Sequence, residues 1–161
     1  MPVQTIDRAQ VNADDAMSSQ IIDAINAGPM LVNYYGHGSV DVWTGAGVLN
    51  DTNAATLSNN SRLSVFVIMT CLNGYAGDAY IDSLGEALMK AQNGGAAAVW
   101  ASSGFTNPQP QFAMSTSFYQ HVFGGTSPRI GDAIRNAKAS IGDNDVRRTW
   151  ILLGDPTMRL R

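Results

Sequence analysis

Four short apolar runs divide the chain, and each is continuous rather than alternating between apolar and polar residues. Runs of this kind are typical of strands that are buried on both faces of a sheet. The clearest is "LSVFVIMT" at Leu63–Thr70, whose β-branched residues favour a central strand. The other predicted strands are Met30–Tyr35, Ala96–Ala101 and Thr149–Leu153, and the first of these is also expected to be buried.

Helical periodicity, with apolar residues three and four positions apart, precedes the first of these runs. The helix that it predicts ends near Ala27, before a Gly-Pro pair, and Asn12 or Asp14 can serve as its N-cap. The polar stretch Gly36–Arg62 is rich in turn-forming residues. We expect it to be irregular, apart from one helical turn near Asn53–Leu57.

Three further helices are predicted beyond the second apolar run. Ser83 and Glu86 have the spacing of a capping box, and the helix that follows is expected to reach about Asn93. Apolar stripes predict the other two at Phe112–Phe123 and Ile130–Ile141. Strands that alternate with helices in this way indicate an α/β fold, in which helices cover both faces of a mostly parallel sheet.

The domain organisation follows from length and linkers. A chain of 161 residues is long enough for one domain with a real core, and no linker rich in Pro, Gly and Ser interrupts it. We therefore expect residues 1–161 to form a single unit. A four-stranded sheet is small for this fold class, and the chain opens on a helix. The sequence thus predicts part of a longer domain that lacks its first strands.

Charge and composition exclude several classes of function. The net charge is −3, and no run of Lys or Arg is present, so we expect no nucleic-acid partner. No apolar stretch approaches the length that spans a bilayer, so we expect no membrane insertion. Residues 1–20 are polar and do not resemble a signal peptide. The single cysteine, Cys71, cannot form an internal disulfide, so cysteine content leaves the redox compartment open.

Two residues with the capacity for catalysis follow successive predicted strands, and they lie close together if these strands are neighbours in the sheet. His37 comes after Met30–Tyr35, and Cys71 comes directly after Leu63–Thr70. In open parallel sheets, ligands bind outside the carboxyl ends of the strands, so both residues leave the sheet at the edge where a site would form. A nearby imidazole can accept the thiol proton and later protonate a departing amine. The pair therefore indicates nucleophilic catalysis by a cysteine.

Acyl transfer by a thiolate also requires donors for the oxyanion that develops on the substrate. Gly38 follows His37 directly and has no Cβ to obstruct its N–H, so this N–H can turn towards the site. The backbone N–H of Cys71 is a natural second donor. Taken alone, each residue also has an ordinary structural interpretation, since a lone cysteine is often a small buried side chain and a turn histidine is often solvated.

The remaining candidates are weaker. His121 lies beside an apolar helical stripe and is expected to be a packing or surface residue. Asp155 is expected to cap a turn, and Asp41 and Asp78 could orient His37 but are more simply solvated. One cysteine and two distant histidines are too few for a zinc site, and no phosphate-binding glycine motif is present. We therefore expect neither a metal nor a cofactor.

Four blocks of the sequence resemble one known family. "YYGHGS" and "VIMTCLNGYAGD" are similar to the histidine and cysteine blocks of the gingipain-type cysteine peptidases, peptidase family C25 of clan CD, which have a caspase-like fold. "SLGEALMKAQNGGAAAVWASSG" resembles the helix and strand that follow the cysteine in that family. "TWILLGDPTMRLR" resembles its closing strand. The resemblance spans about residue 15 to the end, with the blocks in the same order.

The resemblance implies a caspase-like three-layer α/β/α sandwich and a cysteine endopeptidase that acts on polypeptides. Cys71 matches the nucleophile and His37 the general acid/base, with the backbone of Gly38 and Cys71 as oxyanion donors. Ser102, Ser103 and Gly104 match the region that lines the pocket for the residue before the scissile bond. The segment "SSGFTNPQPQF" has no tryptophan, which we would expect over a basic side chain in that pocket.

The resemblance also bears on what surrounds this chain. The family's catalytic domain has a preceding stretch that carries further strands, an acid supporting the histidine and part of the pocket. The resemblance further implies a secreted or cell-surface protein. The absence of the preceding strands would leave a sheet edge exposed, and such an edge would favour self-association. Three alternatives stay open: a sortase-like transpeptidase of a secretion system, a non-catalytic caspase-like binding module, and a flavodoxin-like domain that would need an acidic cluster or a phosphate loop.

Overall fold

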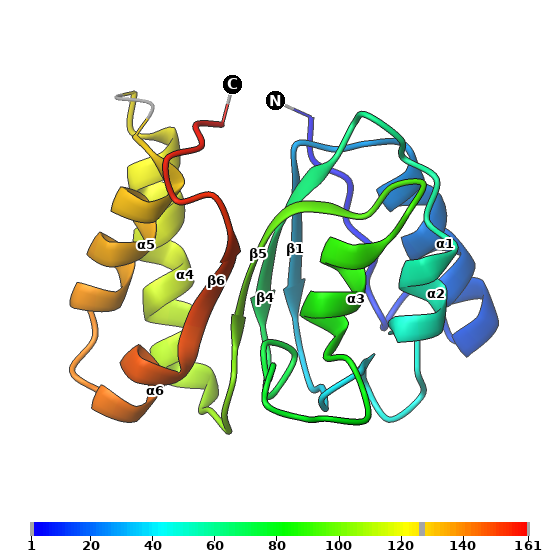
Figure 1. The fold of residues 1–161 in the computed structure, drawn as a ribbon, viewed down its shortest axis with the longest axis horizontal. Helices are drawn as coiled ribbons and strands as arrows, with labels where there is room; N and C mark the ends of the chain where they lie inside the picture. Colours follow the sequence, from blue (N-terminus) through cyan, green and yellow to red (C-terminus); the bar gives the residue numbers. More distant parts are fainter. Residues whose placement is uncertain (1, 126–127, 161) are drawn as a thin grey trace.

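The computed structural model describes residues 2–125 and 128–160, which form a sheet between two groups of helices (Figure 1). The sheet contains β1 (Leu31–Tyr35), β4 (Ser64–Met69), β5 (Ala96–Ser102) and β6 (Trp150–Gly154), in the order β1-β4-β5-β6. β1, β4 and β5 are parallel, and β6 pairs with β5 in the antiparallel direction. The predicted sandwich with a mostly parallel sheet is confirmed, and each of the four predicted strands is present.

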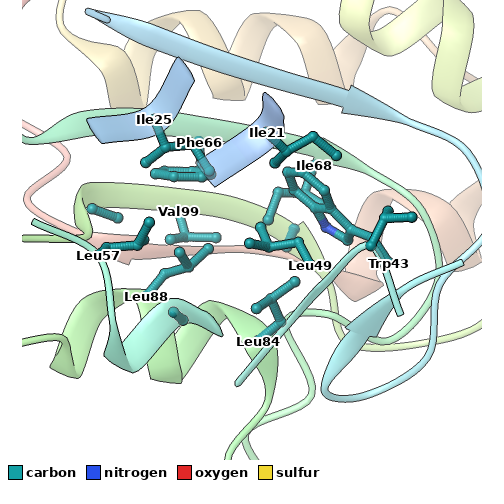
Figure 2. Packing of buried hydrophobic residues seen from close by; sticks show 14 of the residues in the cluster. Ile21, Ile25, Trp43, Leu49, Leu57, Phe66, Ile68, Leu84, Leu88 and Val99 are labelled. Atoms are coloured by element: carbon teal, nitrogen blue, oxygen red, sulfur yellow. The ribbon is translucent and has the colours of Figure 1, made fainter. Parts of the chain in front are cut away.

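One face of the sheet is covered by α1 (Asp14–Asn26), α2 (Asp51–Ala55) and α3 (Leu84–Lys90). Their apolar side chains meet those that alternate positions of β4 and β5 direct to this side. Figure 2 shows the centre of this cluster, formed by Ile21 and Ile25 of α1, Phe66 and Ile68 of β4, Val99 of β5, and Leu84 and Leu88 of α3.

The opposite face is covered by α4 (Pro108–Phe123), α5 (Ile130–Ala139) and α6 (Asn144–Thr149), as Figure 1 shows. The ring of Trp100 on β5 packs against Phe118 of α4, with ring centroids 5.0 Å apart. The side chains of β4 are buried on both faces of the sheet. This explains why the sequence of β4 is continuously apolar instead of alternating, as it would in a strand with one exposed face. The two clusters make the sheet the rigid base from which the site-bearing loops project.

The position of β1 corrects the expectation of a buried strand. β1 pairs only with β4 and forms an edge of the described sheet, where Asn33 and Tyr35 are exposed and the other three residues are half-buried. A short apolar run signals that a strand packs against a core, but it does not reveal how many neighbours the strand has.

The segment expected to be irregular, Gly36–Arg62, contains a short antiparallel hairpin of β2 (Val42–Trp43) and β3 (Leu49–Asn50). The helical turn expected near Asn53–Leu57 begins two residues earlier, as α2. The Asn50 side chain caps it, accepting a hydrogen bond from the Asn53 N–H at 2.8 Å. Two-residue strands lie below the length at which apolar alternation can be recognised in a sequence.

Several predicted helix boundaries also differ. Neither Asn12 nor Asp14 caps α1, because its N-cap is Ala13, which makes no side-chain hydrogen bond. The acidic residues of the first turn instead complement the helix dipole. α3 ends at Lys90 rather than near Asn93, and α4 begins at Pro108, four residues before the predicted start. Proline at the first helical position needs no N–H partner, so it extends the helix beyond the apolar stripe.

The start of β4 and the presence of α6 also differ from the predictions. Leu63 is excluded from β4 and is 42% exposed. The predictions placed no helix at Asn144–Thr149, where α6 lies; the Asp143 side chain caps it by accepting hydrogen bonds from the N–H groups of Asp145 and Val146, both at 3.0 Å. Within residues 2–125 and 128–160, none of the helices has the length and apolar character required to cross a bilayer.

Candidate active site

The loops that follow β1, β4 and β5 leave the sheet at the same end, which lies at the bottom of Figure 1. Tyr35 of β1 is paired with Met69 of β4. His37 and Cys71 therefore each lie two residues beyond paired positions of adjacent parallel strands. The prediction that these two strands are neighbours is confirmed by the sheet order.

Two stacked aromatic residues, Tyr34 and Trp43, help to hold the backbone at His37. The Tyr34 hydroxyl donates a hydrogen bond to the His37 carbonyl oxygen at 2.7 Å, and the Thr44 N–H donates to the same oxygen at 2.8 Å. The Tyr34 ring stacks on Trp43, with centroids 4.1 Å apart. Burial raises the pKa of Tyr34 to about 12, so its hydroxyl remains a donor at neutral pH. The His37 side chain itself is exposed.

The glycines on either side of His37 permit close approach by neighbouring side chains. A Cβ atom at Gly36 would lie 2.6 Å from the Tyr34 hydroxyl oxygen. A Cβ atom at Gly38 would lie 2.9 Å from both Oγ1 and Cγ2 of Thr70, the residue before Cys71. Contacts this short are sterically forbidden for a Cβ atom, so the Gly-His-Gly sequence allows the histidine loop to pack directly against the cysteine loop.

Cys71 is half-buried, and its thiol lies 3.9 Å from the carbonyl oxygen of Thr106, to which it can donate a weak hydrogen bond. The next residue, Leu72, has a φ of 62°, a left-handed conformation that is uncommon for a leucine. Its N–H donates to the Gly104 carbonyl oxygen at 3.2 Å, and the Gly74 N–H donates to that of Ser102 at 2.8 Å. The cysteine loop is thus joined to the segment that follows β5.

The two N–H groups predicted as oxyanion donors, those of Gly38 and Cys71, donate no hydrogen bond to any described residue. Gly38 lies opposite Trp43 in an isolated bridge whose hydrogen bonds run from Ser39 N–H to the Val42 carbonyl and from Thr44 N–H to the His37 carbonyl. The Gly38 N–H takes no part in that pairing. The N–H of Cys71 likewise donates to no carbonyl or side chain in the described parts of the chain. Both groups therefore keep their capacity to donate.

The predicted pocket residues Ser102, Ser103 and Gly104 adjoin the cysteine loop, but their polar groups are used within the fold. The Ser102 hydroxyl donates to the Gly104 carbonyl oxygen at 3.0 Å, and the Ser103 hydroxyl donates to that of Thr149 at 2.9 Å. The adjacent side chain of Phe105 is 81% exposed. Sequence reasoning did not single out Phe105, although an aromatic residue directly after a predicted pocket segment is a signal that could have done so.

The weaker candidates are engaged elsewhere. Asp78 accepts hydrogen bonds from the N–H groups of Tyr80 and Ile81, at 2.8 and 3.2 Å. Asp155 caps a turn as predicted, and the hydrogen bonds from the backbone and side chain of Thr157 hold its carboxyl pKa below the usual value. His121 places Nδ1 2.7 Å from the Ser117 carbonyl oxygen on α4. Residues 2–125 and 128–160 contain no cluster of three or more metal-ligating side chains.

Asn73 is a buried polar residue of the cysteine loop that sequence reasoning did not identify. Its side-chain nitrogen points at three carbonyl oxygens of the histidine loop, those of Ser39, Val40 and Val42. Among residues 2–125 and 128–160, buried polar oxygens of Thr70, Asn73 and Thr106 find no hydrogen-bond partner, and all three residues neighbour Cys71. A polar residue two positions beyond a strand-end cysteine was the available signal.

The sequence and the fold are similar to those of known proteins. The profile of Peptidase family C25 matches residues 3–161. A segment of 78 residues, 47% of this chain, is 40% identical to gingipain R2 of Porphyromonas gingivalis and covers 10% of that protein. The same length of segment is 40% identical to gingipain R1 of that organism and covers 7% of it.

Solved structures give the same result over more of the chain. The crystal structure of the Arg-specific cysteine proteinase gingipain R superposes with a TM-score of 0.81 and 27% identity, covering 89% of this chain and 36% of that one. A complex of the pro- and mature domains of a Porphyromonas gingivalis gingipain superposes with a TM-score of 0.78 and 26% identity, covering 89% of this chain and 37% of that one. The chain therefore spans little more than a third of these structures.

Proposed function

The chain belongs to peptidase family C25, and from this premise we propose that it supplies the nucleophile and the general acid/base of a cysteine endopeptidase. Cys71 is the nucleophile, and His37 is the acid/base. The observation that carries the proposal is their equivalent position, two residues beyond the paired residues Tyr35 and Met69 of adjacent parallel strands. The contact of Gly38 with Thr70 supports it, because it brings the two loops together at those residues.

The proposed reaction proceeds in two steps. In the first, His37 removes the Cys71 thiol proton, the thiolate attacks the carbonyl carbon of a peptide bond, and the N–H groups of Gly38 and Cys71 stabilise the oxyanion. His37 then gives the proton to the departing amine, which leaves a thioester on Cys71. In the second step, His37 removes a proton from water and the resulting hydroxide attacks the thioester carbonyl. The C–S bond then breaks, the acyl part of the substrate leaves as a carboxylic acid, and His37 returns its proton to the Cys71 sulfur.

The proposed substrate is a polypeptide that approaches along the segment Ser102–Gly104. Hydrogen bonds from Leu72 and Gly74 hold this segment beside the nucleophile. Its residues carry no charge, and the exposed ring of Phe105 adjoins it. Within this chain, then, the segment offers apolar contact rather than an ionic partner to a substrate side chain. Export of the protein, as the resemblance implies, is part of the same proposal.

The proposal is tested by the reactivity of Cys71 in the full-length protein that contains this chain. Iodoacetamide is added at pH 6, and alkylation of the Cys71 peptide is followed by mass spectrometry. An imidazole that ionises the thiol makes it react faster than a free cysteine at this pH. We expect His37→Ala to slow alkylation by about tenfold or more. The matched control is His121→Ala, which should leave the rate unchanged, because His121 lies on α4 and is engaged with Ser117.

Two results would count against the proposal. Equal alkylation rates in the wild type and His37→Ala would remove the imidazole from the activation of the thiol. Peptide hydrolysis that persists in Cys71→Ser at the wild-type rate would remove Cys71 as the nucleophile.

A further inference from the structure

Asn73 connects the two loops that carry the candidate catalytic residues. Its side chain is fully buried, and Nδ2 lies 2.5 Å from the Ser39 carbonyl oxygen, 3.3 Å from that of Val42 and 3.4 Å from that of Val40. An amide nitrogen has two hydrogens, so the shortest bond goes to Ser39 and the second hydrogen is shared. One side chain thereby binds three carbonyls of the loop that begins at His37, of which those of Val40 and Val42 also accept backbone hydrogen bonds from Leu84 and Ser39.

The backbone of Asn73 is fixed as firmly as its side chain. Its N–H donates to the Cys71 carbonyl oxygen at 2.8 Å, and its own carbonyl accepts a hydrogen bond from the Gly85 N–H at 2.8 Å. A Cβ atom at Gly85 would lie 2.7 Å from that carbonyl oxygen, so α3 packs directly against Asn73. The Leu84 N–H also donates to the Val40 carbonyl, at 2.8 Å. Asn73 is thus held by the start of α3 while it holds the histidine loop.

We propose that Asn73 is a positioning residue, which sets the distance and orientation of His37 relative to Cys71 by binding the backbone of residues 39–42. This inference rests on the proposed function and assigns Asn73 no contact with substrate. Its physical basis is that ion-pair formation and proton transfer require the two side chains within hydrogen-bond reach. The exposed His37 side chain has freedom of its own, so the placement of its backbone limits where the imidazole can go.

Two variants remove the donor in different ways. Asn73→Ala deletes the amide, and Asn73→Asp keeps its shape but places a carboxylate acceptor against three carbonyl acceptors. The matched control is Asn59→Ala. Asn59 is also fully buried, and its Nδ2 also binds backbone carbonyls, those of Arg62 and Gly95, both at 3.0 Å. It lies beside the amino ends of β4 and β5, away from the site, so it reproduces the loss of stability without touching the proposed site.

The experiment measures the pH profile of Cys71 alkylation in the full-length wild type and in the variants, below the melting temperature of each. We expect both Asn73 variants to lose about tenfold or more of the rate at pH 6 and to approach the profile of His37→Ala. We expect Asn59→Ala to keep the wild-type profile despite its lower melting temperature. A merely structural role for Asn73 would lower the melting temperature without changing the profile.

The outcomes separate this inference from the proposed function. If the wild type and His37→Ala share one profile, the proposed function fails and this inference fails with it. If His37→Ala differs from the wild type while the Asn73 variants do not, only the role of Asn73 is overturned, and an equal loss in Asn59→Ala overturns it too. Should neither Asn73 variant fold, hydrogen exchange in the wild type decides, because rapid exchange at the Ser39 and Thr44 amides would show that the loop is not held.

Discussion

Gly38 and Thr70 are in such close contact that no side chain fits between them. A Cβ atom at Gly38 would lie 2.9 Å from both Oγ1 and Cγ2 of Thr70, and 3.0 Å from the carbonyl oxygen of Val42. Gly38 follows His37, and Thr70 precedes Cys71. The contact therefore joins the two loops at the positions that flank the proposed catalytic pair, and its loss should separate them.

We predict that Gly38→Ala lowers the rate of peptide hydrolysis by about tenfold or more, because the new methyl group pushes the histidine loop away from Thr70. The measurement is kcat/KM of the full-length protein on a peptide substrate. The control is Gly45→Ala in the same loop, where a Cβ atom would meet nothing within 4 Å. A loss of activity in Gly45→Ala as large as that in Gly38→Ala would show that the loop tolerates no alanine, whatever the contact.

A second variant identifies Thr70 as the partner. Adding Thr70→Ala to Gly38→Ala removes both atoms at 2.9 Å and should restore part of the rate, since only the contact with the Val42 carbonyl remains. Strictly additive losses in the double variant would mean that the two residues do not interact.

Tyr34 gives a prediction about stability at alkaline pH. Burial raises its pKa from the ordinary value of 10.0 to about 12, and burial raises the pKa of Tyr119 as well. Between these limits the unfolded chain loses the tyrosine protons while the folded protein keeps them. The free energy of unfolding should therefore fall as pH rises from about 10 towards 12. The stability that the neutral phenols provide is fully present below pH 10.

The matched variant is Tyr34→Phe, which keeps the stacking on Trp43 and removes only the titrating hydroxyl. Urea unfolding from pH 8 to 11 measures how the free energy of unfolding depends on pH. Its slope against pH should be shallower in this variant than in the wild type, by an amount that corresponds to at most one proton per molecule. The hydroxyl also donates to the His37 carbonyl, so the variant should be less stable at pH 8 by about 1 kcal/mol. A pH dependence identical to that of the wild type would contradict the assigned pKa.

The sequence predicted the parts of the site that depend on regular structure. His37 and Cys71 could be assigned to one edge because continuous apolar runs mark their strands and parallel strands end at the same edge. The edge position of β1 could not be predicted, because a run of apolar residues does not specify how many strands lie beside it. Asn73 was missed because its partners are backbone carbonyls of a loop that only the folded chain brings near.

The capping box predicted at the start of α3 is confirmed, and it allows a simple stability test. The Ser83 hydroxyl accepts a hydrogen bond from the Glu86 N–H at 3.3 Å, and the Glu86 carboxylate accepts one from the Ser83 N–H at 3.0 Å. We predict that Ser83→Ala lowers the free energy of unfolding by about 1 kcal/mol. Glu86→Gln, which keeps an acceptor oxygen, should cost less. Equal losses in urea unfolding would contradict this order, because they would mean that the charge of Glu86 contributes as much as the Ser83 hydroxyl.

Phe105 offers a test of how the proposed site selects its substrate. Its ring is 81% exposed, and the next residue, Thr106, places its carbonyl oxygen near the Cys71 thiol. An exposed aromatic side chain on the residue before Thr106 can bury apolar surface of a bound peptide, while it takes no part in ionising the thiol. We predict that Phe105→Ala raises KM for a peptide with an apolar residue before the scissile bond by about fivefold, or roughly 1 kcal/mol of binding. The rate of Cys71 alkylation should not change.

Phe123→Ala is the control, because Phe123 is 51% exposed at the far end of α4. A fall in the alkylation rate in Phe105→Ala would instead mean that this ring supports the loop around the thiol, and an unchanged KM would remove it from substrate binding.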